Sequence, residues 1–104
     1  MQAPYAIGYA MGAEEQLDFL LAQQKPRNGA RAVRVLIDKL DAAFETLSAF
    51  PRYGAVSSQE RLAGLGYRKL VLYPFVLLYT MDDERHLIEI QGVFHHRQNY
   101  GAEL

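Results

Sequence analysis

The chain has 104 residues and a mass of 11.8 kDa, the size of one folding unit, so we expect a single domain over residues 1–104. It contains no cysteine, which excludes disulfide bonds and thiolate metal sites. Eleven basic and twelve acidic side chains give a net charge of -1 and are spread evenly along the sequence, which argues against a protein that grips nucleic acid over a large basic surface.

The start of the chain has none of the features of an export signal. Residues 1–13 lack both a basic beginning and a sustained apolar stretch. No run anywhere in the sequence approaches the roughly 18 apolar residues that a membrane span needs. We therefore expect a cytoplasmic protein without a membrane partner.

Alternating apolar side chains mark the first predicted element. Tyr5, Ile7 and Tyr9 occupy every second position, which is the period of a strand with one buried face, so we predict a strand over residues 5–10. The apolar spacing then changes to three and four residues, with acidic side chains near the start. This change predicts an amphipathic helix over residues 13–24.

A break and a second helix follow. The sequence from Lys25 to Gly29 combines a proline with asparagine and glycine, which disfavour the continuation of a helix, so we predict a turn there. The residues after it keep their apolar side chains on one helical face. That face consists of Val33, Leu36, Ile37, Leu40, Ala43, Phe44 and Leu47. We predict a helix that ends before Phe50 and Pro51, followed by a long polar loop to Gly64.

The second half of the chain is rich in strand-forming residues. Three such runs are separated by Pro74 and by the acidic turn at residues 82–84. The runs cover residues 67–73, 75–81 and 86–94. The resulting order β-α-α-β-β-β predicts an α+β fold, in which a helical hairpin packs on one face of a twisted antiparallel four-stranded sheet. The first strand is expected to pair with one of the later strands.

The histidines are the main candidates for chemistry. All three lie near the C-terminus, and His95 and His96 are adjacent, so a strand would point them to opposite faces and they could not chelate one metal ion together. We therefore expect no metal site and no cofactor. One histidine could act as a general acid or base. The alternative is that these are ordinary solvated residues at the end of a strand.

Five segments in order carry a resemblance that covers nearly the whole chain. They are Ala13-x-x-x-Leu17, Leu47-Ser48-Ala49-Phe50-Pro51-Arg52-Tyr53-Gly54, Gly66-Tyr67-Arg68-Lys69-Leu70, Val76-Leu77-Leu78-Tyr79 and Val93-Phe94-His95-His96-Arg97-Gln98-Asn99-Tyr100. Together they resemble the RelE/ParE superfamily of toxins from type II toxin-antitoxin (plasmid stabilisation) systems. The fold of that superfamily agrees with the order of elements predicted above.

The resemblance implies two classes of activity. RelE-like members cleave mRNA on the ribosome without a metal ion, and ParE-like members bind and poison DNA gyrase. For a RelE-like mRNA endoribonuclease, the resemblance makes Arg68, His95 and Arg97 the catalytic candidates, with His96 and Tyr100 secondary.

One departure favours the ParE-like branch, and with it a growth-inhibiting gyrase poison. Several ribonuclease members carry a basic residue where this chain has Val76. The low pI of about 6.3 points the same way, since docking among ribosomal phosphates gains from positive charge. A degenerate member that only binds its antitoxin is a third possibility.

The resemblance also implies a cognate antitoxin, whose extended and partly helical segment would fold onto the toxin. The expected surface is the groove between the helical hairpin and the sheet, together with the last strand and the tail. The candidates for contact with the antitoxin or the target are Arg52, Tyr67, Lys69, Phe94 and Tyr100, and Leu104 is a further candidate for the antitoxin. The alternative for Phe94, Tyr100 and Leu104 is that they close the core or fray.

Overall fold

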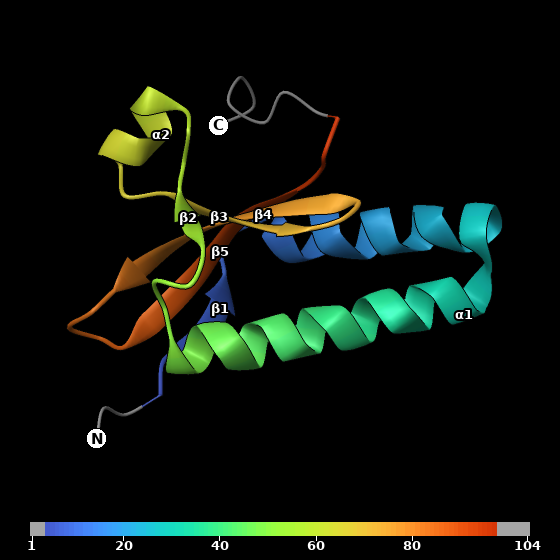
Figure 1. Cartoon of the computed structure of the whole chain (residues 1–104), viewed down its shortest axis with the longest axis horizontal. Helices are drawn as coiled ribbons and strands as arrows, with labels where there is room; N and C mark the ends of the chain where they lie inside the picture. The colour runs from blue at the N-terminus through green and yellow to red at the C-terminus, as the bar shows by residue number, and fades with distance from the viewer. Residues whose placement is uncertain (1–3, 98–104) are drawn as a thin grey trace.

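The computed structural model describes residues 4–97. The elements in chain order are β1 (Ala6–Tyr9), α1 (Ala13–Ala49), β2 (Ala55–Val56), α2 (Glu60–Gly64), β3 (Arg68–Leu72), β4 (Phe75–Asp82) and β5 (Leu87–His95) (Figure 1). The predicted α+β class and the three C-terminal strands are confirmed. The segment predicted as a polar loop contains two short elements, β2 and α2, which are too brief to leave a periodic signal.

The long helix α1 folds back on itself at Gly29. This residue has φ 85° and ψ 165°, a backbone conformation that side chains with a Cβ disfavour and glycine adopts readily. It divides α1 into a first arm (residues 13–28) and a second arm (residues 30–49), which lie side by side as a hairpin (Figure 1). The predicted break between the two helices is confirmed, and it lies at the last residue of the predicted turn, Gly29.

Pro26 lies inside the first arm and does not end it. A proline removes the hydrogen bond to the carbonyl four residues earlier, which here belongs to Ala22. Because Ala22 is exposed, water can satisfy that carbonyl, so the arm continues for several residues beyond the predicted end at residue 24.

The strands form one five-stranded sheet in the order β1-β5-β4-β3-β2, one strand more than the four predicted, because the two-residue β2 adds to the edge at β3. The antiparallel meander of β3, β4 and β5 is as predicted. The strand β1 pairs with a later strand, β5, as expected. This pairing is parallel and not antiparallel, and runs from Ala6 opposite Leu87 to Tyr9 opposite Ile90. The short β1 leaves β5 uncovered beyond this point. There the side chain of Gln16 supplies a hydrogen-bond acceptor in place of a strand, because its Oε1 accepts a hydrogen bond from the backbone N of Val93 at 3.2 Å.

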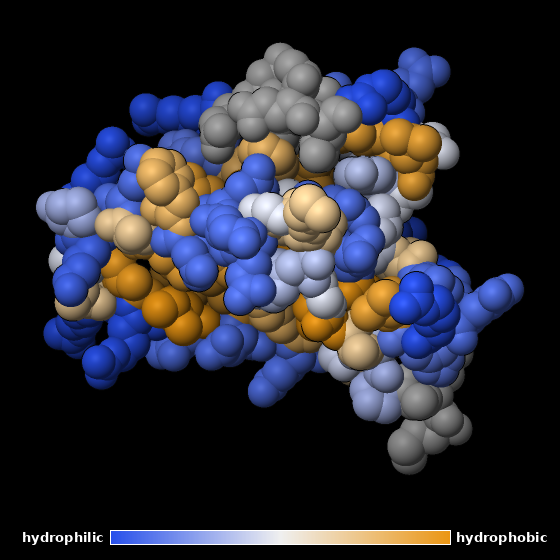
Figure 2. All heavy atoms as spheres, turned by 180° about the vertical axis from the view of Figure 1, so that it is seen from behind, coloured by the Kyte–Doolittle hydropathy of each residue, from blue (hydrophilic) through white to orange (hydrophobic). Residues whose placement is uncertain are grey.

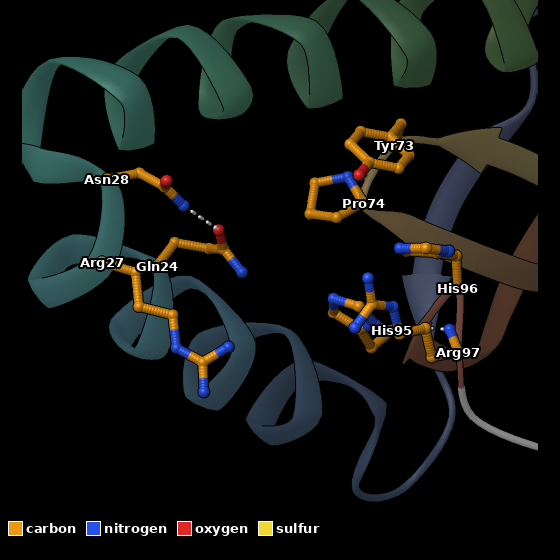
Figure 3. A pocket seen from close by; sticks show the side chains of 8 residues that line it. All are labelled: Gln24, Arg27, Asn28, Tyr73, Pro74, His95, His96 and Arg97. Carbon is orange, nitrogen blue, oxygen red and sulfur yellow. Dashed lines mark hydrogen bonds between the residues drawn. The ribbon is translucent and has the colours of Figure 1, made fainter.

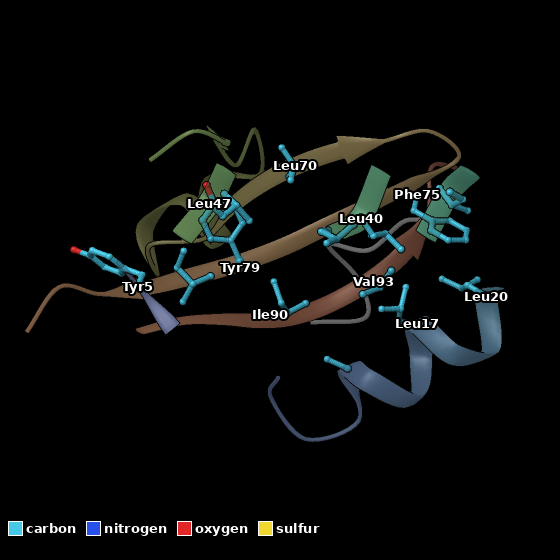
Figure 4. Packing of buried hydrophobic residues seen from close by; sticks show 14 residues of the cluster. Tyr5, Leu17, Leu20, Leu40, Leu47, Leu70, Phe75, Tyr79, Ile90 and Val93 are labelled. Atoms are coloured by element: carbon cyan, nitrogen blue, oxygen red, sulfur yellow. The ribbon is translucent and has the colours of Figure 1, made fainter. Parts of the chain in front are cut away.

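The main core lies between the sheet and the two arms of α1. The arms contribute Ala13, Leu17, Leu20, Leu36, Leu40 and Leu47, and the strands contribute Leu70, Phe75, Leu77, Tyr79, Ile88, Ile90 and Val93 (Figure 4). Full burial of a leucine or isoleucine side chain contributes about 1.5–3 kcal/mol, so this layer fixes both arms against the sheet. It also fixes the position of the hairpin tip relative to the end of β5.

A second, smaller core covers the opposite face of the sheet. Leu62 of α2 packs there against Leu78 and Phe94, with Tyr67 half-buried at the margin. Phe94 is only 2% exposed. The expectation that Phe94 offers binding surface is therefore wrong, because α2, which the sequence did not reveal, covers its ring.

Candidate functional site

A cavity of about 450 Å³ opens where the first arm of α1 faces the end of β5. Eight residues line it, namely Gln24, Arg27, Asn28, Tyr73, Pro74, His95, His96 and Arg97 (Figure 3). We call it the basic cavity. Three of its residues come from the helix, two from the turn between β3 and β4, and three from the end of β5 and the residues after it.

Strand pairing places the histidines at this cavity. His95 is the last residue of β5 and pairs with Phe75, the first residue of β4, so it lies beside the β3–β4 turn. It shares its face of the sheet with Val93, the face on which the α1 arms pack. The next residue, His96, is also fixed beside the β3–β4 turn, because its backbone N donates to the carbonyl of Pro74 at 2.8 Å.

Helical spacing supplies the other wall. Gln24 lies one turn after the buried Leu20 and therefore faces the sheet, where it is only 9% exposed. Its Oε1 accepts a hydrogen bond from Nδ2 of Asn28 at 2.7 Å, which links two turns of the arm. Arg27 extends from the same tip, and the three side chains point toward the residues of β5 (Figure 3).

The cavity is positively charged. Among the described residues, its lining contains two arginines and two histidines but no aspartate or glutamate, in a chain whose net charge is -1. Burial, and then the neighbouring His96, Arg97 and Arg27, lower the pKa of His95. The two imidazole rings lie 4.5 Å apart, and the ring of Tyr73 lies 4.8 Å from that of His96. The arrangement can bind an anion.

Arg68 lies elsewhere. It pairs with Tyr79 on β4, whereas His95 pairs with Phe75 on the other side of that strand. Four positions along a strand correspond to roughly 13 Å. The guanidinium of Arg68 donates to the carbonyls of Gly54 at 2.7 Å and Arg52 at 3.4 Å. The structure brings His95, His96 and Arg97 together but does not bring Arg68 to them.

The remaining predicted contact residues are spread over other surfaces. Arg52 forms an exposed ion pair with Asp83 at 2.5 Å. Lys69 is half-buried next to the short β2, and Tyr67 packs at the margin of the smaller core. Tyr100 and Leu104 lie outside the described residues. Arg52, Lys69 and Tyr67 therefore do not line the basic cavity.

A groove continues from the basic cavity along the second arm of α1. Its first part, about 140 Å³, adds Ala32, Val35, Leu36 and Lys39 to residues shared with the cavity, namely Gln24, Asn28, Tyr73 and Pro74. Its second part, about 290 Å³, is lined by Lys39, Ala42, Ala43, Thr46, Tyr53, Leu70, Val71 and Leu72. We call this the helix–strand groove. Seen from behind, apolar side chains lie between charged ones across the half of the surface that the α1 arms form (Figure 2).

The groove combines apolar side chains with an open sheet edge. Val35, Val71 and Tyr73 are 47%, 58% and 71% exposed. The strand β2 pairs only with Arg68 and Lys69, so the outer edge of residues 70–72 has no strand beside it in the described part of the chain. Such an edge can pair with the backbone of another chain.

Among residues 4–97, no three histidine, cysteine, aspartate or glutamate side chains gather as a metal ion would require. Over the same residues, no helix has the length and apolar character needed to cross a membrane.

Comparison with known proteins defines the family. The chain matches the model of the ParE toxin of type II toxin-antitoxin system, parDE, over residues 7–100. It belongs to this family. The resemblance to the RelE/ParE superfamily is thereby confirmed, although no curated protein matches the chain by sequence.

Solved structures agree with the ParE toxin family fold. The toxin-antitoxin complex RelBE2 from Mycobacterium tuberculosis includes a chain 27% identical to this one, with a TM-score of 0.62 over 91% of this chain and 94% of that chain. A chain of the chromosomal ParDE system from P. aeruginosa gives a TM-score of 0.67 at 16% identity, over 90% and 98% of the two chains. The latter likeness concerns the fold alone.

The helical half of the site in this ParE family toxin was not found from its sequence. Gln24, Arg27 and Asn28 lie in and next to a segment that the sequence marks only as a helix break. The spacing from Leu20 to Gln24 was the one available signal, because it places Gln24 on the buried face. Their approach to His95 depends on packing between distant segments.

Proposed function

We propose that this toxin is neutralised by a cognate antitoxin and inhibits growth by binding and poisoning DNA gyrase. The observation that carries the choice of target is the distance between Arg68 and the pair His95 and Arg97. A ribonuclease site needs its acid, base and phosphate-binding groups around one phosphate, within hydrogen-bond reach of the reacting atoms. Arg68 instead bonds to the backbone of Gly54 and Arg52.

The environment of Val76 supports the same choice. The resemblance places a cation at this position in several ribonuclease members, and loss of such a donor typically raises the barrier by about 3 kcal/mol. Here Val76 is 5% exposed and pairs with the buried Phe94. A charged side chain could not replace it without disturbing the smaller core.

The helix–strand groove is the proposed binding site of the antitoxin. Its apolar lining and the open edge at residues 70–72 suit a segment that adds backbone hydrogen bonds and inserts apolar side chains. The RelBE2 structure from M. tuberculosis is a toxin-antitoxin complex, and the P. aeruginosa structure is of a ParDE toxin-antitoxin system. Antitoxin binding in the groove would cover Val35, Val71 and Tyr73.

The alternative function is a metal-independent mRNA endoribonuclease. The observation in its favour is that His95, Arg97 and Arg27 share one cavity, which could hold a phosphate next to a proton-transfer group. Arg68 would then have no direct part in catalysis. A non-toxic member that only binds its antitoxin is the remaining alternative.

Inducible expression in a bacterial host separates these functions. Growth, the ends of cellular mRNA and the inhibition of gyrase supercoiling by the purified toxin are measured together. Gyrase inhibition with intact mRNA is expected. New mRNA ends with unaffected gyrase would instead establish the endoribonuclease, and normal growth with neither effect would identify a silent binding protein.

Variants of the cavity sharpen the distinction. His95→Ala should leave gyrase inhibition within a few-fold of the unmodified toxin, because contact and not chemistry is required. For an endoribonuclease, the same change should reduce cleavage by about 10²- to 10⁴-fold. Toxicity of Arg68→Ala should fall only as far as its folded fraction falls, which an unfolding curve measures independently.

Antitoxin binding is tested by a pair of matched variants. Val35→Asp places a charge in the groove, whereas Phe19→Asp makes the same kind of change at an exposed residue of the first arm outside it. With the antitoxin encoded beside the toxin, Val35→Asp should weaken binding at least tenfold and Phe19→Asp by less than twofold. Equal effects would place the interface elsewhere.

A further inference from the structure

We propose that the basic cavity is a carboxylate-binding site, which receives acidic side chains of the same antitoxin segment that lies in the helix–strand groove. This inference rests on the proposed function, because it takes the antitoxin as the occupant of the groove. It adds the chemistry of the partner: an apolar stretch followed by one or two aspartates or glutamates.

Charge is the first support. Arg27 lies on the first arm of α1 and Arg97 follows β5; both are permanently cationic and share the cavity lining with His95 and His96. No carboxylate among the described lining residues offsets this positive charge, which favours an incoming anion. An arginine can bind a carboxylate through two parallel hydrogen bonds, which gives both strength and a fixed orientation. The Gln24 amide also points into the cavity and can add a neutral donor (Figure 3).

Continuity with the groove is the second support. The cavity and the first part of the groove share Gln24, Asn28, Tyr73 and Pro74. A segment with apolar side chains against Val35 therefore reaches the cavity within its next few residues. The lining changes along this path from mainly apolar side chains with one lysine, Lys39, to the two arginines of the cavity. A complementary antitoxin segment must therefore change from apolar to acidic side chains at the same point.

The limited extent of the charge favours a carboxylate over a nucleic acid. Nucleic-acid affinity grows with the number of phosphates neutralised, and this cavity offers only two permanent cations in a chain with twelve acidic residues. The lining of the adjoining groove is mainly apolar and adds one cation, Lys39, for a phosphate backbone to bind. A peptide with one or two acids uses both parts.

The cavity also gives the interaction a pH dependence. His96, Arg97 and Arg27 surround His95, with Tyr73 across from His96, and burial and these three basic groups lower the pKa of His95 in the free toxin. A bound carboxylate would favour the protonated imidazole and raise that pKa. Protons are then taken up on binding, so the complex should become tighter as pH falls from 8 to 6.

The test measures the dissociation constant of the full-length toxin and its antitoxin by calorimetry. The double variant Arg27→Gln/Arg97→Gln removes both permanent charges of the cavity, and Arg31→Gln/Arg34→Gln removes two exposed charges from the second arm outside both the cavity and the groove. We expect the first variant to weaken binding at least tenfold at low salt and to flatten its salt and pH dependence. The second variant should stay within twofold of the unmodified toxin.

The outcomes separate the inference from the proposed function. Unchanged affinity of Arg27→Gln/Arg97→Gln, with Val35→Asp still disruptive, would overturn the carboxylate site and leave the groove intact. No binding by the unmodified toxin would overturn the proposed function itself. Unfolding curves of all variants ensure that the comparison concerns folded protein.

Two further measurements identify the occupant. Acids of the antitoxin are replaced singly by their amides and combined with Arg27→Gln, and we expect one of them to show a non-additive loss that marks direct contact. Additive losses at every acid would contradict the proposal. Displacement of the antitoxin by a ten-nucleotide single-stranded RNA, in the unmodified toxin but not in Arg27→Gln/Arg97→Gln, would assign the cavity to nucleic acid and also overturn it.

Discussion

The hydroxyl of Tyr79 holds the backbone of Gly54 against the sheet. It accepts a hydrogen bond from the N of Gly54 at 2.8 Å and donates one to the carbonyl of Pro51 at 2.9 Å. Arg68 binds the carbonyl of Gly54 on the same stretch of backbone. These bonds fix the path by which the chain leaves α1 and begins β2. They also hold the Arg68 guanidinium at this end of β3, where strand register has already placed it away from the basic cavity.

Removal of the Tyr79 hydroxyl should therefore destabilise the protein. Tyr79→Phe keeps the buried ring but leaves the N of Gly54 and the carbonyl of Pro51 without their partner, at a cost of about 1–3 kcal/mol in the free energy of unfolding. Urea denaturation measures this loss. Tyr53→Phe, at a side chain that is 63% exposed, is the control and should change stability by less than about 0.5 kcal/mol.

A methyl group at position 54 should be harmful for a different reason. A Cβ there would lie 2.6 Å from both the carbonyl oxygen of Lys69 and the hydroxyl of Tyr79. Backbone and a fully buried ring cannot move aside cheaply, so Gly54→Ala should cost about 1–3 kcal/mol. Gly64→Ala is the matched change, because nothing lies within 4 Å of a Cβ at that position. Equal unfolding midpoints for the two variants would refute the close approach.

The second arm of α1 offers a contrast between core and binding surface. Leu47 is completely buried, and Leu47→Ala should lower the free energy of unfolding by about 2–5 kcal/mol through lost burial and a cavity. Val35, on the same arm, is 47% exposed in the groove. Val35→Ala should leave stability within about 0.5 kcal/mol but weaken antitoxin binding. Thermal melts with and without antitoxin distinguish the two effects.

Asp83 should make stability depend on acid pH. The hydrogen bond from Tyr5, and then that from Arg52, lower the pKa of the Asp83 carboxyl from its ordinary value of 3.8. The ionised carboxyl therefore stabilises the fold above about pH 4, and this contribution disappears as pH falls through the lowered pKa of the folded state.

We expect the urea midpoint of Asp83→Asn to lie below that of the unmodified protein at neutral pH, and the difference to shrink below about pH 4. Measurement of both proteins from pH 7 down to pH 3 checks this. A difference that stays constant over that range would show that the carboxyl charge is not responsible. Tyr5→Phe, which removes the larger cause of the shift, should reduce the pH dependence without abolishing it.

The sequence was sufficient for elements whose pattern is local. The three- and four-residue spacing that ends at Leu47 required a helix with one buried face. The later runs of strand-forming residues, bounded by Pro74 and the turn at residues 82–84, indicated strands. A glycine at position 29 allowed the positive φ that ends the first arm. The sequence could not locate the break between the two arms more precisely within residues 25–29, because a proline only disfavours helix in the residue before it.

Relations between distant segments were decided by tertiary structure alone. The parallel pairing of β1 with β5, the burial of Phe94 under Leu62, and the meeting of Arg27 with His95 each depend on the path of the intervening chain. The motif that suggested Arg68 and His95 as partners gave their order along the chain but not their register in the sheet. Sequence periodicity determines which face of an element is buried, whereas hydrogen-bond pairing and packing across the whole domain determine which faces meet.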